Sequence, residues 1–148
     1  MSSEEVPAGA PHDAPRHAGG PIAIVAGHGE FARGVISAVQ HITGYGARLL
    51  PLIIHGLGPA DIEDALLRLV DESGARVIFT DLPAGSCTIA AGRVARARPD
   101  VLVVTGVSLP ALLYFVMHEG AAPADAARQA IDRARTALRV VGGATRGD

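Results

Sequence analysis

The chain has 148 residues, of which 49% are hydrophobic and 19% are charged, and its formal net charge at neutral pH is -2. This length suits one domain, and so large an apolar fraction excludes a chain that is disordered throughout. The slight negative charge supplies no positive field for a phosphate backbone, so we expect no nucleic acid among the partners.

The beginning of the chain differs in composition from the rest. Residues 1–20 are rich in Pro, Gly, Ala and Ser and lack apolar periodicity. This composition predicts a flexible N-terminal tail, followed by one domain over residues 21–148.

Three features bear on the compartment. The tail has acidic residues where a secretion signal would have basic ones, and no apolar stretch follows them. The uncharged run 101–117 is interrupted by glycine and proline, so it predicts no membrane span. The one cysteine, Cys87, has no second cysteine to pair with, which suits a reducing environment. We therefore expect a cytoplasmic protein.

The first part of the domain alternates apolar runs with helical patterns. The run IAIVA at 22–26, followed by a glycine, predicts a buried strand that ends in a tight turn. From Phe31 to Ile42, apolar residues recur three or four apart, which predicts a helix that ends near Gly44. The segment RLLPLIIHG predicts a second strand, and Pro51 favours an edge position because its missing N–H costs least there.

The same alternation continues to the end of the chain. Apolar residues at helical spacing, preceded by acidic ones, predict a second helix around 61–70. A third strand at 76–81 and a fourth at 101–106 flank a third helix, and two more helices follow, the last from Pro123 to about Arg139. This alternation predicts an α/β fold with a doubly wound, mainly parallel sheet and helices on both faces.

In such a fold, ligands and chemistry collect in the loops beyond the carboxyl ends of the strands. His28 lies in the first of these loops, between two glycines and directly before a helix. Imidazole is nucleophilic near neutral pH, and Gly29 with the N–H groups that open the helix predicts an anion site. His28 is thus a candidate phosphoryl acceptor. The position equally suits a histidine that only satisfies hydrogen bonds in a glycine-rich turn.

Asp81 ends the third strand and should open onto the same crevice as His28. A carboxylate bonded to one imidazole nitrogen fixes the tautomer and leaves the other nitrogen free to attack. A strand-end aspartate more often caps the turn that follows it, and that alternative stays open. Gly85 and Ser86 are candidates to hold phosphoryl oxygens through a backbone N–H and a hydroxyl.

Other classes of site have little support. His28, Asp81 and Ser86 could form a hydrolytic triad, but no serine has the glycine pattern of a nucleophile elbow. The glycines around His28 match neither a Walker loop nor a dinucleotide-binding pattern. The remaining histidines show no metal-ligand spacing, so we expect neither a metal nor a cofactor.

Three segments together suggest a family. They read IAIVAGHGEFARGVISAVQHITG, VIFTDLPAGSCTIAA and VLVVTGVSLPALL, between about residue 21 and residue 118. In order and spacing they resemble the mannose-family enzyme IIA proteins of the bacterial phosphoenolpyruvate-dependent sugar phosphotransferase system. The departures from the family pattern are Ala84, Cys87 and Ser108.

The resemblance implies a function for the candidate residues. His28 corresponds to the histidine that accepts a phosphoryl group from HPr, as a phosphohistidine, and passes it to an enzyme IIB for sugar uptake. Asp81 corresponds to the aspartate that supports this histidine, and Gly85 and Ser86 to the Gly and Ser that follow it. The membrane enzymes IIC and IID would be involved only indirectly.

The resemblance also implies an architecture. The family has a doubly wound sheet of the 2-1-3-4 type and is commonly a homodimer that exchanges a short C-terminal strand, for which Val140 and Val141 are available. Two other functions remain open. One is a regulatory protein whose His28 phosphorylation state controls a partner without driving transport. The other is a flavodoxin-like module that binds a small molecule and does not depend on His28.

Overall fold

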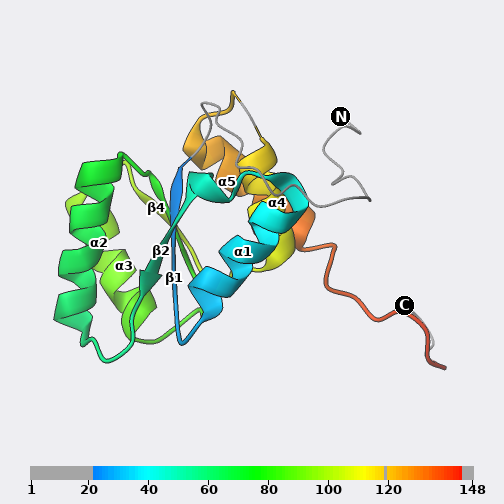
Figure 1. Ribbon diagram of the computed structural model, residues 1–148, viewed down its shortest axis with the longest axis horizontal. Coiled ribbons are helices and arrows are strands. Elements are labelled where there is room, and N and C mark those ends of the chain that lie inside the picture. The colour runs from blue at the N-terminus through cyan, green and yellow to red at the C-terminus, as the bar shows by residue number, and fades with distance from the viewer. Residues whose placement is uncertain (1–21, 119, 145–148) are drawn as a thin grey trace.

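The computed structural model describes residues 22–118 and 120–144, and the tail expected over residues 1–20 lies outside these ranges. Strands and helices alternate along the chain in the predicted order (Figure 1). The elements are β1 (Ala23–Gly27), α1 (Phe31–Thr43), the 3-10 helix η2 (Gly46–Arg48), β2 (Leu49–Ile53), α2 (Pro59–Ser73), β3 (Val77–Thr80), α3 (Ser86–Ala97), β4 (Leu102–Val104), α4 (Leu109–Met117) and α5 (Pro123–Ala134).

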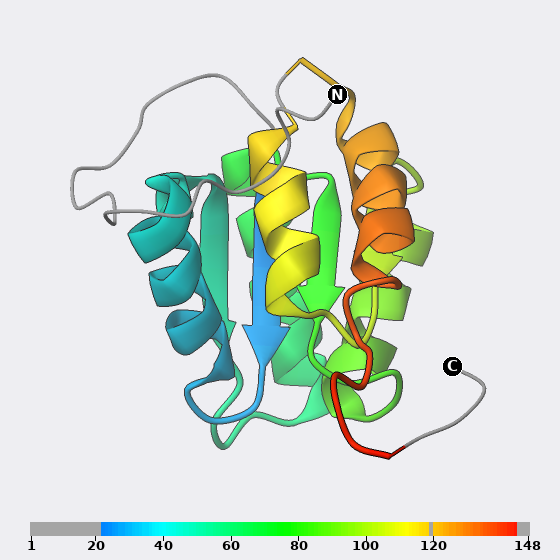
Figure 2. The ribbon, with the colours of Figure 1, turned by 90° about the vertical axis from the view of Figure 1, so that its right-hand side faces the viewer.

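The four strands form one parallel sheet in the order β2-β1-β3-β4, which confirms the expected 2-1-3-4 order. Pro51 lies in the edge strand β2, as its missing N–H predicts. In the register of the sheet, Gly27 of β1 is opposite Ile53, and Ala26 is opposite Thr80. Because all strands run the same way (Figure 2), their carboxyl ends share one edge of the sheet, which we call the carboxyl edge.

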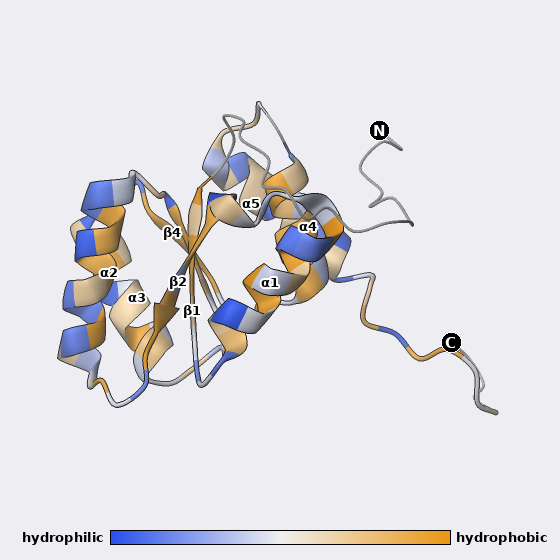
Figure 3. Cartoon of the chain, in the orientation of Figure 1, coloured by the Kyte–Doolittle hydropathy of each residue, from blue (hydrophilic) through white to orange (hydrophobic). Residues whose placement is uncertain are grey.

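Helices cover both faces of the sheet, because side chains along each buried strand alternate between two cores. On one face, α1, α4 and α5 pack over alternate strand residues such as Val25 and Phe79, and the Phe79 ring meets Phe115 of α4 edge to face at 5.1 Å. On the other face, α2 and α3 pack over Ile24 and Ile78. Figure 3 shows the corresponding pattern, with hydrophobic strands in the middle and hydrophilic residues on the outer side of α2.

The last helix is shorter than the sequence predicts. We expect it to run to about Arg139, but α5 ends at Ala134, and the next residues form tight turns in which the N–H of Ala137 donates to the Ala134 carbonyl. The hydroxyl of Thr136 also donates to the carbonyl of Arg133, which competes with helical bonding. The apolar side chains beyond this point are exposed, so they add no buried face that would stabilise a longer helix.

The chain then leaves the domain as an irregular C-terminal segment, residues 138–144, which projects away from the helices in Figure 1. Its apolar side chains, Leu138, Val140 and Val141, are all exposed. Within the part of the chain that the structure describes, no helix is both long enough and apolar enough to cross a membrane.

Candidate active site

His28 lies at the carboxyl edge, in the turn that joins β1 to α1. β1 ends at Gly27, and the N–H of Phe31, the first residue of α1, donates to the His28 carbonyl at 3.0 Å. Gly29 has a φ of 55°, a conformation that glycine adopts without strain, and this lets the chain turn directly into the helix. The His28 side chain is 58% exposed, so another molecule can reach its ring.

Asp81 follows β3, the neighbour of β1, and contacts His28 twice through one oxygen. The backbone N–H of His28 donates to Oδ2 of Asp81 at 2.8 Å, and Nδ1 of the imidazole lies 2.9 Å from the same oxygen. Because an ionised carboxylate only accepts hydrogen bonds, Nδ1 carries the hydrogen in this pair. The lone pair of the neutral ring is therefore on Nε2, and that is the nitrogen able to attack an electrophile.

Burial and hydrogen bonding act in opposite directions on Asp81, whose side chain is only 11% exposed. Burial tends to raise its pKa, but the hydrogen bonds from the backbone and the ring of His28 outweigh burial, and the pKa is lowered below its ordinary value. Asp81 therefore stays ionised at neutral pH. Its second oxygen, Oδ1, is buried and has no hydrogen-bond partner among the described residues.

Gly27 makes this contact possible. A Cβ added at Gly27 would lie 2.8 Å from the ring of Phe31 and 3.1 Å from the carboxylate of Asp81. The sequence suggests that the glycines beside His28 let the backbone approach a bound group. The structure gives Gly27 another role, because it leaves the space that Asp81 occupies against β1.

Gly85 and Ser86 lie at the same edge, where α3 begins. Gly85 caps the helix with φ 108° and ψ 176°, a backbone conformation essentially restricted to glycine. Ser86 is exposed in the first turn, where helical N–H groups have no intrahelical acceptor. In the described part of the chain, neither residue forms a hydrogen bond with His28, so the structure brings together His28 and Asp81 but leaves Gly85 and Ser86 as neighbours at the edge.

Two threonines that the sequence analysis did not single out hold the loop between Asp81 and α3. The Thr88 hydroxyl donates to the carbonyl of Leu82 at 2.6 Å, and the hydroxyls of Thr80 and Thr88 lie 2.8 Å apart. Thr80 is fully buried, and its own carbonyl accepts from the N–H of Val107 at 3.0 Å. Asp81 thus lies between two residues that hydroxyl groups tie to α3.

The remaining polar residues near the site have other partners or are inert. Arg33 lies 3.7 Å from Glu30 in an exposed ion pair within the first turns of α1. Burial, with a smaller contribution from the Asp81 charge, raises the pKa of the Cys87 thiol to about 11, so it is not a nucleophile at neutral pH. Within the described ranges, no cluster of His, Cys, Asp or Glu side chains could hold a metal ion.

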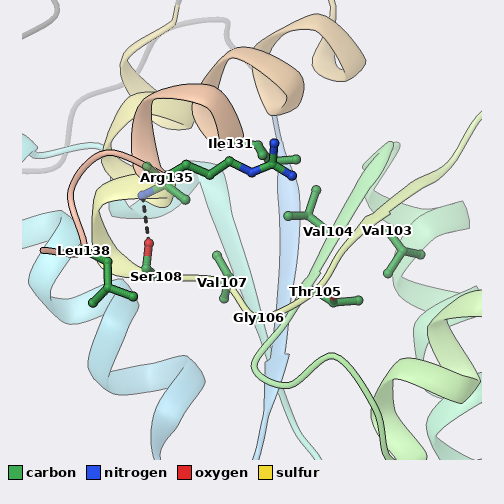
Figure 4. Close-up of a pocket in the computed structure, with 11 residues that line it drawn as sticks. Val103, Val104, Thr105, Gly106, Val107, Ser108, Ile131, Arg135 and Leu138 are labelled. Atoms are coloured by element: carbon green, nitrogen blue, oxygen red, sulfur yellow. Dashed lines mark hydrogen bonds between the residues drawn. The ribbon is translucent and has the colours of Figure 1, made fainter. Parts of the chain in front are cut away.

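A pocket lies beside the edge strand β4, at its carboxyl end. Its volume is about 560 Å³, and it lies between the end of β4, the start of α4 and the end of α5. Val104 and Val107 line it, and the Arg135 side chain extends across it towards Ile131 (Figure 4). Ser108 caps α4 at its rim by accepting from the N–H of Ala111 at 3.4 Å. Among the described residues, the polar side chains that line the pocket are those of Thr105, Ser108 and Arg135, and the lining does not include His28 or Asp81.

Comparisons with known proteins agree with the fold and identify the family. The family model EIIA-man, described as the PTS system fructose IIA component, matches residues 22–132. Phosphotransferase system component EIIA from Streptococcus agalactiae is 21% identical, with a TM-score of 0.72 over 80% of this chain and 95% of that chain. The mannose/sorbose specific IIA subunit from Enterococcus faecalis is 17% identical, with a TM-score of 0.72 over 86% of this chain and 98% of that chain.

A third similar structure has a different description. A sigma-54 interaction domain protein from Enterococcus faecalis is 13% identical, with a TM-score of 0.67 over 84% of this chain and 94% of that chain. No curated protein matches the chain. At these identities the structural likenesses establish the fold, whereas the family model covers most of the domain.

Proposed function

Since this chain belongs to the EIIA-man family of phosphotransferase system IIA components, we propose that it is a cytoplasmic phosphocarrier that accepts a phosphoryl group on His28 from HPr and passes it to an enzyme IIB. The observation that carries the proposal is the exposed His28 ring, whose Nδ1 is held 2.9 Å from Oδ2 of Asp81, a side chain that is only 11% exposed. This pairing prepares a nucleophile without a metal or a cofactor.

The reaction forms one bond and breaks one. The lone pair on Nε2 of His28 attacks phosphorus, the bond between phosphorus and HPr breaks, and its electron pair leaves with HPr. His28 then carries the phosphoryl group on Nε2 and keeps its hydrogen on Nδ1, where the Asp81 carboxylate balances the positive charge that develops on the ring. Transfer to the enzyme IIB reverses these steps on the acceptor.

The carboxyl edge also offers groups for the phosphoryl oxygens. The first turns of α1 and α3 both begin there, and their N–H groups favour anions. We assign Gly29, Gly85 and the Ser86 hydroxyl to this role. Positioning and charge stabilisation supply most of the catalysis in phosphoryl transfer, so these groups need not take part in bond making.

Exposed apolar side chains at the same edge support a protein as phosphoryl donor and acceptor. Leu57 follows β2, Leu82 follows Asp81, and Ile89 lies in the first turn of α3, with Leu82 and Ile89 about half exposed at 50% and 51%. Apart from Ile22 and the C-terminal segment, these are the exposed large hydrophobic residues of the described chain. Such side chains suit a protein interface that closes around His28 and excludes water.

The edge strand β4 and the C-terminal segment support a homodimer. In the described part of the chain, β4 is an edge strand, the pocket of about 560 Å³ lies beside it, and the apolar side chains of residues 138–144 are exposed. We propose that the C-terminal segment, with Val140 and Val141, packs on a second copy of the chain, as the exchanged strand of the family implies.

The test of the phosphocarrier function is intact-mass spectrometry after incubation with phosphoenolpyruvate, enzyme I and HPr. We expect one added phosphoryl group, labile in acid and absent from His28→Ala. Nuclear magnetic resonance of the phosphorylated protein should place the group on Nε2. If HPr is phosphorylated and this chain gains no mass, the phosphocarrier proposal is wrong.

A regulatory function is the second candidate, because the fold also occurs in a protein described as a sigma-54 interaction domain protein. In that case the His28 phosphorylation state would control a partner, and no enzyme IIB would accept the group. Genes for enzymes IIB, IIC and IID beside this one, and transfer from the phosphorylated chain to that IIB, would favour sugar uptake. Stable phosphorylation with no transfer to any such IIB would favour regulation.

A further inference from the structure

We propose that Thr88 is a positioning residue for phosphotransfer, because its hydroxyl holds the peptide that follows Asp81 and so aims the Asp81 carboxylate at His28. This inference rests on the proposed phosphocarrier function, and it concerns a side chain that touches neither His28 nor the transferred group.

The first step is the bond from Thr88 to the loop. Thr88 is the third residue of α3, and its hydroxyl reaches back across the helix start to donate to the Leu82 carbonyl at 2.6 Å. The residue in the cap position of α3 is Gly85, which has no side chain, and no side-chain hydrogen bond caps the helix. The hydroxyl therefore holds the loop and does not cap the helix.

The second step is the anchor on the other side of Asp81. The Thr80 hydroxyl donates to the Leu82 carbonyl at 3.2 Å and lies 2.8 Å from the Thr88 hydroxyl. Because the Thr88 hydrogen goes to the Leu82 carbonyl at the shorter distance of 2.6 Å, Thr80 is the donor between the two hydroxyls and shares its one hydrogen between the Thr88 oxygen and the Leu82 carbonyl. Thr80 is buried within β3 and paired with Ala26 of β1, so the strand fixes one end of this chain of bonds and α3 fixes the other.

The third step is the way in which the Asp81 carboxylate is held. Both bonds from His28 end on one oxygen, Oδ2, and the other oxygen is buried without a partner in the described residues. A carboxylate held by one oxygen depends on its backbone for orientation. A loop free to shift by a few tenths of an ångström would lengthen both bonds together, and hydrogen bonds weaken steeply with distance and angle.

The experiment compares Thr88→Val, which keeps the shape and removes the hydroxyl, with Thr88→Ser, which restores it. In unphosphorylated Thr88→Val we expect a smaller fraction of the Nδ1–H tautomer of His28 and a pKa of Asp81 that rises towards its ordinary value. Nuclear magnetic resonance measures both, the tautomer from the nitrogen-15 shifts of the ring and the pKa from the carboxyl signal as the pH changes. The rate of phosphorylation by phospho-HPr should fall about threefold to tenfold, as expected for the loss of one positioning hydrogen bond. Thr88→Ser should recover all three readouts.

Thr43→Val is the control, because the Thr43 hydroxyl, like that of Thr88, donates to a backbone carbonyl, here that of Val39 at 2.8 Å. It should lower the melting temperature and leave the His28 tautomer and the Asp81 pKa unchanged. A Thr88→Val protein that is only less stable, with the tautomer and the pKa of the wild type, would overturn the proposal. Should Thr88→Val fail to fold, Thr88→Ala, measured in the same way, carries the test.

The measurements of the His28 tautomer and of the Asp81 pKa need no phosphoryl donor. They therefore test whether Thr88 positions Asp81 even if the wild-type chain accepts no phosphoryl group. That result would contradict the phosphocarrier function but not the positioning of Asp81 by Thr88.

Discussion

The loop after β3 and the segment after α5 are both irregular, yet their residues are held in different ways. In residues 81–85, hydroxyl groups fix the Leu82 carbonyl and two bonds from His28 fix Asp81. In residues 138–144, the apolar side chains of Leu138, Val140 and Val141 are exposed. The hydrogen bonds that hold the first region all come from the same chain. They keep Asp81 at a fixed distance from His28, as phosphoryl transfer requires. The second region leaves its apolar side chains exposed in the part of the chain that the structure describes, as expected of a region that packs on a second chain.

The largest effect should come from breaking the first region at Asp81. We expect Asp81→Asn to lower the rate of phosphorylation about a hundredfold to ten-thousandfold, because an amide neither balances the ring charge nor fixes the Nδ1–H tautomer. Rapid-quench kinetics with phospho-HPr measure this rate. A fall of less than about threefold would mean that Asp81 is only a turn cap, as strand-end aspartates often are.

The next largest effect should come from Gly27→Ala. Its Cβ would lie 3.1 Å from the Asp81 carboxylate and 2.8 Å from the Phe31 ring, so the carboxylate must move away from His28. We expect the phosphorylation rate to fall about tenfold to a hundredfold, since small displacements are costly in oriented reactions.

Gly34→Ala is the control for that variant. Gly34 lies in α1, and a Cβ there would have no neighbour within 4 Å. We expect it to keep the wild-type rate and to stabilise the fold by about 0.5 to 1 kcal/mol, the usual gain for alanine over glycine in a helix. Equal rates for both variants would show that the space beside Gly27 is not needed.

Charged side chains in the C-terminal segment should disrupt its packing on a second chain. We expect the double variant Val140→Lys with Val141→Lys to weaken dimerisation about tenfold to a thousandfold, because each exposed valine that packs on a partner contributes about 1.5 kcal/mol or more. Sedimentation equilibrium measures this constant. A wild-type chain that is monomeric at all concentrations would contradict the dimer and would require another cover for this segment.

A smaller effect should show that HPr binds at the carboxyl edge and not at the C-terminal segment. Ile89→Ser removes a half-exposed apolar side chain at the carboxyl edge, and we expect KM for phospho-HPr to rise about fivefold to thirtyfold with little change in kcat. Leu138→Ser removes an exposed side chain of the C-terminal segment and should leave KM for phospho-HPr unchanged. Steady-state transfer assays measure both, and equal effects would refute the assignment of the HPr surface to the carboxyl edge.

The sequence predicts the fold well because its signals are local and repeated. The sequence pattern predicts all four strands and five α-helices of the described chain but not the short 3-10 helix η2, and Pro51 correctly predicts the edge strand. Adjacent strand ends also predict that His28 and Asp81 meet. The end of α5 is predicted too late, because it depends on whether the side chains beyond it become buried, which spacing does not reveal.

The finer parts of the site were beyond the sequence. The role of Gly27 depends on the distance between β1 and Asp81, and the role of Thr88 depends on a bond to the carbonyl of Leu82. Both are contacts between segments that are distant in sequence or that belong to an irregular loop. No periodic pattern encodes them, because each involves a single side chain or its absence.

The smallest predicted effect concerns acid pH. The His28 hydrogen bonds outweigh burial and lower the pKa of Asp81 below its ordinary 3.8 in the folded protein. Because the folded state then binds the proton less readily than the unfolded state, ionised Asp81 stabilises the fold above pH 3.8. That stability is lost as the pH falls through the lowered pKa.

Urea unfolding at neutral pH and at pH values below 3.8 tests this dependence. We expect the difference in free energy of unfolding between the wild type and Asp81→Asn to be on the order of 1 kcal/mol at neutral pH and to shrink in acid. Residues 135–144 contain no acidic group, so the difference between the wild type and Val140→Lys with Val141→Lys should not change over the same window. If the difference in free energy of unfolding for Asp81→Asn stays constant with pH, the bonds to His28 do not favour the ionised carboxylate. The loop after β3 would then show no more dependence on pH than the segment after α5.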